Sequence, residues 1–169
     1  MTRAAAIRDR VVDLRRVRAG DLLPSPRNWR THPPAQRAAL RGVLAEIGYA
    51  DALLVRETPD GLMLVDGHLR AEETPDAVVP VLVLDLDEAE ADKLLLTLDP
   101  LAAMAGADAD ALAALLATVE TGDAAVQALL DGLAAQGVPA FEPVGIDEQS
   151  RLDLKKSITC PECGHVFTS

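Results

Sequence analysis

Residues 65–70 read Val-Asp-Gly-His-Leu-Arg and place three side chains capable of chemistry around a glycine. An apolar run precedes this motif and a segment of helical composition follows it. A strand that passes through a glycine turn into a helix leaves backbone N–H groups free, and the helix dipole makes them attractive to anions. With His68 and Arg70 beside that point, the pattern predicts a phosphate site. A tight turn with Asp66 as the helix N-cap and Gly67 relaxing the backbone explains it as well.

Several regular elements must position this motif. Apolar runs with alternation or β-branched bias predict strands over residues 11–17, 52–57, 62–65 and 78–84. Helical spacing of apolar residues predicts helices over residues 34–47 and 87–98, and a short helix that begins at His68. Strands interleaved with helices indicate an α/β (α+β) domain, which we place at residues 11–99.

The composition changes beyond residue 99. Segments 108–119 and 123–135 are rich in Ala and Leu, each opens with Asp, and together they predict an antiparallel α-helical hairpin within a helical extension, residues 100–136. Residues 137–154 contain the prolines and glycines of a linker. A tail of residues 155–169 follows.

The tail contains both cysteines of the chain, in the sequence Cys160-Pro-Glu-Cys163-Gly-His165. Two thiolates at this spacing can chelate one Zn²⁺, and His165 is a candidate third ligand, so the tail resembles half of a zinc ribbon. A closed site needs a fourth ligand, from a second subunit or a partner. A metal-free vestige is the alternative, because half-sites bind zinc weakly.

A polar loop, residues 27–34, precedes the first predicted helix and is bounded by prolines. It carries Asn28, Arg30 and the only tryptophan, Trp29. Loops of this kind often carry function, because their side chains are not committed to a core. A rigid connector whose Trp29 plugs the domain is the alternative interpretation.

The 169-residue chain has a net charge of −11, which argues against a protein that coats DNA without selectivity. The charge is uneven, because residues 1–41 hold ten arginines against three aspartates. A basic N-terminal face could meet phosphates, and a solvated arginine-rich surface explains the pattern equally well. No apolar run approaches the roughly 20 residues that span a bilayer. We therefore expect no membrane contact and a cytoplasmic location.

In their order along the chain, these segments resemble the ParB/sulfiredoxin superfamily, in its ParB-like nuclease (ParB N-terminal) domain form. The matching segments within residues 17–98 are 21–30, 44–48, 54–55, 64–71 and 79–86. The resemblance implies a small mixed sheet with flanking helices. The Asp-Gly-His-x-Arg motif is similar to that of mobile-element proteins, which often accompany DNA methyltransferases.

The resemblance also implies that the turn 66–70 binds the phosphates of a nucleotide, CTP or ATP/ADP, with Mg²⁺ as a candidate cofactor. Gly67 and His68 would offer backbone N–H groups, and the His68 and Arg70 side chains would contact phosphate oxygens. Asn28 and Arg30 would close over the nucleotide. DNA, a second copy of the chain in a homodimer and a DNA methyltransferase are the implied macromolecular partners.

Two further functions stay open. A metal-dependent nuclease or phosphotransferase would use Asp66 and His68 as catalytic residues. A non-catalytic adaptor would assemble through the helical extension and the cysteine tail. The chain departs from partition ParB proteins in having no helix-turn-helix pattern, and from sulfiredoxin in having no cysteine at the motif.

Overall fold

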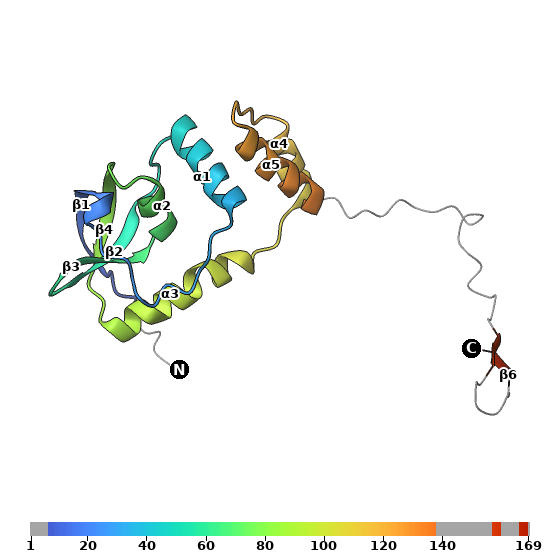
Figure 1. Cartoon of the computed structure of the whole chain (residues 1–169), viewed down its shortest axis with the longest axis horizontal. Coiled ribbons are helices and arrows are strands. Elements are labelled where there is room, and N and C mark those ends of the chain that lie inside the picture. Colours follow the sequence, from blue (N-terminus) through green and yellow to red (C-terminus); the bar gives the residue numbers. More distant parts are fainter. Residues whose placement is uncertain (1–6, 138–156, 160–165, 169) are drawn as a thin grey trace. The chain divides into compact units, whose positions relative to one another are not determined.

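The computed structural model describes residues 7–137, 157–159 and 166–168 (Figure 1). Contacts within the chain divide it into two units, residues 1–138 and 139–169. The first unit contains a four-stranded sheet and its helices, and the second contains a two-stranded sheet. The predicted boundaries at residues 99, 136 and 154 stay predictions.

The sheet of the first unit is mixed, as the sequence predicts. Its strands are β1 (Val11–Arg18), β2 (Leu53–Thr58), β3 (Gly61–Asp66) and β4 (Val78–Leu84). The spatial order is β1-β4-β2-β3. β4 is antiparallel to β1 and parallel to β2, and β2 is antiparallel to β3. The edge of β3 is partly covered, because the backbone of Leu23 bonds to Leu62 and Leu64.

One face of this sheet forms the core. Leu53 and Val55 of β2 lie opposite Val81 and Val83 of β4, and all four are at most 1% exposed, as is Val79. Residues two positions apart on a strand point to the same face, so this register gathers the apolar side chains on one side. The core is aliphatic because aromatic residues make up only 2% of the chain.

Five α-helices and one 3-10 turn accompany the sheet in the first unit. They are η1 (Ala19–Asp21), α1 (Pro34–Glu46), α2 (His68–Glu73), α3 (Glu88–Ala103), α4 (Ala109–Leu116) and α5 (Ala124–Gly137). The sequence prediction ended the third of these α-helices at residue 98, and this was wrong. Pro100 removes one backbone donor, and α3 continues for one further turn beyond it. No helix in the described part of the chain is long and apolar enough to cross a membrane.

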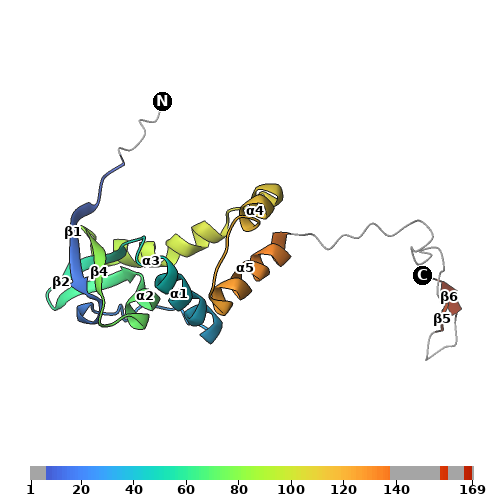
Figure 2. The same cartoon turned by 90° about the horizontal axis from the view of Figure 1, so that it is seen from above.

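The helical hairpin packs on the domain through α1, which lies between α2 and α5 (Figure 2). Gly42 of α1 permits this approach, because a Cβ atom there would lie 2.5 Å from Asp123 and 2.6 Å from Val126. Glu46, at the end of α1, accepts hydrogen bonds from the Gly122 and Asp123 N–H groups at 2.9 and 3.2 Å. The carboxylate thereby satisfies free N–H groups just before α5.

The second unit contains an antiparallel hairpin of β5 (Ser157–Thr159) and β6 (Val166–Thr168). The predicted zinc ligands Cys160, Cys163 and His165 lie outside the described residues. The zinc half-site therefore stays a prediction.

Candidate functional site

The motif lies where β3 turns into α2, and its geometry requires glycine. Gly67 has a φ of 93°, in the left-handed region, and a Cβ atom there would lie 2.6 Å from the Cγ of Leu53. Gly67 is itself the N-cap of α2 and supplies no side-chain cap. The prediction of Asp66 as the N-cap was therefore wrong.

The imidazole of His68 lies in the core, where 6% of the residue is exposed. Its Nε2 accepts a hydrogen bond from the backbone N–H of Ser25 at 3.1 Å. Burial lowers the pKa of His68, so the ring is neutral at pH 7 and its proton resides on Nδ1.

The Nδ1–H donor of His68 has no acceptor among the described residues. No fully buried side-chain nitrogen or oxygen in this part of the chain lacks a partner, so this nitrogen reaches solvent-accessible space. His68 therefore uses one ring nitrogen to hold a loop and presents the other as a free donor.

Arg70 is held between two carboxylates. Its guanidinium donates to Asp66 Oδ2 and to Asp51 Oδ2, each at 3.0 Å, and 18% of its side chain is exposed. Asp66, at the end of β3, lies four positions before Arg70, whereas Asp51 lies 19 positions away. These contacts fix the fork of Arg70 beside the start of α2. These two bonds use two of the five N–H donors of the guanidinium.

The second predicted segment, loop 28–32, lies against the motif. Asn28 shapes the loop, because its Oδ1 accepts from the Arg30 N–H at 3.3 Å. Arg30 pairs with Asp99 of α3. The charges of Arg30 and His32 both act on the pKa of His68, which puts them in the same neighbourhood. Asn28 and Arg30 thus lie together in one loop, and Ser25 just before it contacts the motif.

Trp29 does not plug the domain, because 56% of the residue is exposed. Its ring lies under Arg30, whose guanidinium carbon is 5.3 Å from the ring centroid. Trp29, Arg30 and His32 line an open cavity of about 410 Å³ that α3 borders on its other side. That alternative interpretation of the tryptophan was wrong.

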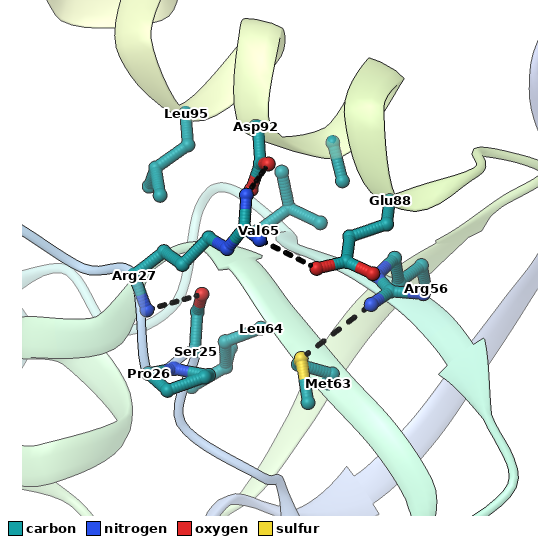
Figure 3. A pocket seen from close by; sticks show the side chains of 11 residues that line it. Ser25, Pro26, Arg27, Arg56, Met63, Leu64, Val65, Glu88, Asp92 and Leu95 are labelled. Atoms are coloured by element: carbon teal, nitrogen blue, oxygen red, sulfur yellow. Dashed lines mark hydrogen bonds and ion pairs between the residues drawn. The ribbon is translucent and has the colours of Figure 1, made fainter.

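Arg27 anchors the same loop to α3. It pairs with Asp92 and with Glu88, the latter at 2.9 Å, above a smaller cavity of about 130 Å³ (Figure 3). Figure 3 shows the Arg27 side chain reaching across this cavity from the loop to the helix. No local pattern indicated either partner, because more than sixty positions separate them from Arg27.

The far end of α2 is braced by arginines that the sequence interpretation also missed. Glu73 accepts from Arg37 at 2.5 Å and from Arg41 at 2.6 Å, and 10% of its side chain is exposed. The hydrogen bonds from Arg37 and then from Arg41 lower the pKa of the Glu73 carboxyl. Both arginines lie on α1, so this ion-pair cluster fixes α1 against α2.

Metal-binding side chains are sparse around the motif. Within residues 7–137, no group of three or more His, Cys, Asp and Glu side chains is arranged to hold a metal ion. Asp66 and Asp51 are the two carboxylates that accept hydrogen bonds from the same guanidinium, that of Arg70. A metal ion at this point would need oxygen ligands from a bound molecule as well.

Comparisons with known proteins add two structural similarities. No protein-family model and no curated protein matches the chain. The chain is similar to the C-terminally truncated chromosome-partitioning protein ParB from Caulobacter crescentus complexed with CTP-γ-S, at 20% identity and a TM-score of 0.49, over 62% of this chain and 63% of that one. The same protein complexed to the centromeric parS site gives 18% identity and a TM-score of 0.42, over 73% and 69%.

The first alignment spans less than two thirds of the length of that ParB chain. Identities and TM-scores at this level establish neither a shared family nor a shared ligand.

Proposed function

We propose that this chain is a ParB-like nucleotide-binding module that acts on or near DNA. The phosphates of a CTP- or ATP-class nucleotide would lie at the turn 66–70. The observation that carries the proposal is the hydrogen bond from the Ser25 N–H to Nε2 of His68, which joins segment 21–30 to the turn 66–70. Both lie in segments that match the superfamily, and more than thirty positions separate them in sequence.

The donors around the turn suit a phosphate. The His68 Nδ1–H has no acceptor among the described residues, and the Arg70 guanidinium, two positions further along α2, is held by Asp66 and Asp51. A guanidinium can donate two parallel hydrogen bonds to phosphate oxygens, which makes it stronger than a single neutral donor. Arg30 would join from the loop after leaving Asp99.

Mg²⁺ is the expected companion of the nucleotide. When phosphates draw Arg70 away, Asp66 and Asp51 are left as two carboxylates without their cation. Mg²⁺ usually binds through one or two carboxylates together with substrate phosphates and waters. The residues present fit that arrangement, in which the protein supplies two ligands and the nucleotide the remainder.

Isothermal titration of the full chain with CTP, ATP and ADP, with and without Mg²⁺, tests the proposal. Heat of binding should appear for at least one nucleotide, and Arg70→Ala should weaken it by about tenfold or more, since hydrogen bonds to charged groups contribute roughly 1.5–3 kcal/mol. Arg16→Ala, on the exposed side of β1, is the matched control and should bind as the wild type does. Absence of heat with every nucleotide would refute the proposal.

Two further measurements separate the remaining functions. Binding of the chain to DNA should weaken steeply with salt, because displaced counterions dominate such binding. Nucleotide hydrolysis or plasmid nicking that disappears in both Asp66→Ala and His68→Ala would assign the enzymatic alternative instead.

A further inference from the structure

The four-stranded sheet protects one of its two edges and leaves the other open. Beside β3, the backbone of Leu23 bonds to Leu62 and Leu64, at 2.8 Å in both cases. At the opposite edge β1 pairs with β4 on one side, and within residues 7–137 no strand pairs with its other side (Figure 2). β1 is eight residues long and contains no proline, so it lacks two common protections of an edge strand. Its free N–H and C=O groups can pair with another strand.

The outward groups of β1 can be identified from the hydrogen bonds around it. The Ala19 N–H, just after the strand, donates to the Ala77 carbonyl and so faces the β4 side. Successive residues of an antiparallel strand face their neighbour alternately, so the backbone groups of Leu14 and Arg16 face outward. The Leu14 N–H accordingly donates to the Asp13 carboxylate at 2.8 Å, away from the ladder.

The side chains of this strand are largely uncovered. Leu14 and Val12 are 65% and 63% exposed. On the other face of the strand, Arg15 pairs with Asp13 at 2.7 Å and with Glu57 at 2.9 Å. The edge therefore offers apolar area together with two opposite charges, Asp13 and Arg15, that lie two positions apart.

Two copies of β1 match one another best in the antiparallel register centred on Leu14. In this register Asp13 lies opposite Arg15 of the second copy at two symmetric places. Val11 lies opposite Val17. The two nearest registers that also pair the outward groups would put Asp13 against Asp13 or Arg15 against Arg15. Because like charges directly opposite each other destabilise a strand pair and opposite charges stabilise it, charge complementarity selects the register centred on Leu14.

We propose that the open edge of β1 is the contact surface for a second copy of this chain. The two β1 strands pair antiparallel about a twofold axis at Leu14, and the two four-stranded sheets join into one. The Leu14 N–H leaves the Asp13 carboxylate for the Leu14 carbonyl of the second copy. The freed carboxylate then meets Arg15 of that copy. This contact needs no nucleotide, so the inference does not rest on the proposed function.

Sedimentation velocity of the full chain over about 1–300 µM, without nucleotide, should show a monomer that becomes a dimer as the concentration rises. Asp13→Arg and Arg15→Asp should each weaken the dimer by about tenfold or more, because two opposite-charge pairs become two like-charge pairs. An equimolar mixture of the two variants should dimerise as the wild type does, since every charged pair across the contact is again of opposite sign. Asp60→Arg, in the exposed turn between β2 and β3, makes the same change of charge and should leave the dimer unchanged.

Disulfide trapping tests the register. In a chain with Cys160→Ser and Cys163→Ser, Leu14→Cys should cross-link two copies on oxidation, because Cα atoms directly opposite each other lie about 4.5–5.5 Å apart, within reach of a disulfide. Val12→Cys, at a position of similar exposure, should not cross-link. In this register the two copies of residue 12 are four positions apart along the strands, about 13 Å.

A chain that stays monomeric over the whole concentration range would refute the inference. A dimer that Asp13→Arg leaves intact, or that Leu14→Cys fails to cross-link, would also refute it, because the copies would then meet elsewhere or in another register. The proposed function depends on its own titration with nucleotides and stands or falls independently of these results.

Discussion

The backbone N–H of Ser25 lies 3.1 Å from Nε2 of His68, and this hydrogen bond joins the segment that leads into loop 27–34 to the first residue of α2. It requires an unprotonated Nε2. Protonation of His68 would turn the acceptor into a donor facing another donor, and it would place a charge in a site that is 6% exposed. The loop and the motif are therefore coupled through the neutral form of one histidine.

This coupling predicts a dependence of stability on pH. Burial lowers the pKa of His68 below its ordinary 6.5, so the unfolded chain binds this proton more readily than the folded one. Stability from this group is fully present above pH 6.5 and is lost as the pH falls below it. Chemical denaturation between pH 7.5 and 5 should show a falling free energy of unfolding.

The matched variants are His68→Gln and His32→Gln. The first should flatten this part of the pH profile, and the second should keep most of the slope, because burial, and not the charge of His32, is the main cause of the lowered pKa of His68. An unchanged slope in His68→Gln would show that the acid sensitivity arises elsewhere.

Gly67→Ala should destabilise the fold more than an alanine at another left-handed glycine. Ala at positive φ costs about 1–2 kcal/mol, and displacement of the buried Leu53 adds about 1–3 kcal/mol. Gly48 has a φ of 86° with nothing within 4 Å of an added Cβ, so Gly48→Ala isolates the backbone cost. Urea denaturation of both variants measures the difference. Equal losses would contradict the close approach of Leu53.

Two further glycines, one on α1 and one on α5, allow a second matched comparison. Gly42→Ala in α1 should weaken the packing of α5, because its Cβ would lie 2.5 Å from Asp123. Gly132→Ala on α5 has nothing within 4 Å and should stabilise that helix by about 1 kcal/mol, the difference in helix propensity. Hydrogen exchange should therefore accelerate in α5 for Gly42→Ala and slow for Gly132→Ala. Faster exchange in both variants would contradict this account of Gly42.

The pKa of the Glu90 carboxyl should be measurably lowered. The hydrogen bonds from Arg10, at 2.6 and 2.7 Å, lower the pKa of Glu90 to about 2, and the Asp87 N–H adds to the shift. Its contribution to stability is present above the ordinary pKa and lost as the pH falls towards 2. NMR titration of carboxyl carbons should show this pKa rising towards 4.5 in Arg10→Gln. Arg8→Gln, which removes a contact at 3.5 Å, should raise it much less.

Local patterns predicted the elements well, because the information lies within each segment. The β-branched run 78–84 gives β4 over Val78–Leu84, and the helical spacing after Pro34 gives α1. Pro100 misled the prediction of α3, because a proline usually ends a helix at the preceding residue, whereas here the helix tolerates the one missing N–H and continues to Ala103.

Partners from distant segments could not be predicted for the site. The sequence indicated Asp66 and Arg70 together, since both belong to the motif 65–70. It could not indicate that Asp51 pairs with Arg70 or that Asp99 pairs with Arg30, because these ion pairs depend on tertiary packing. The burial of His68 was missed for the same reason. A polar residue at the start of a helix is expected to be exposed, whereas His68 is buried and its Nε2 accepts from the Ser25 N–H.

The pairing of β1 only with β4 has a consequence for synthesis of the chain. During translation β1 emerges first, yet its hydrogen-bonding partner is complete only when Leu84 has left the ribosome. The β2–β3 hairpin can close on its own in the meantime, but the parallel contact of β2 also waits for β4. Domains fold as units once their last strand is available. The nascent chain therefore completes its four-stranded sheet in one late step, when β4 becomes available to pair with both β1 and β2.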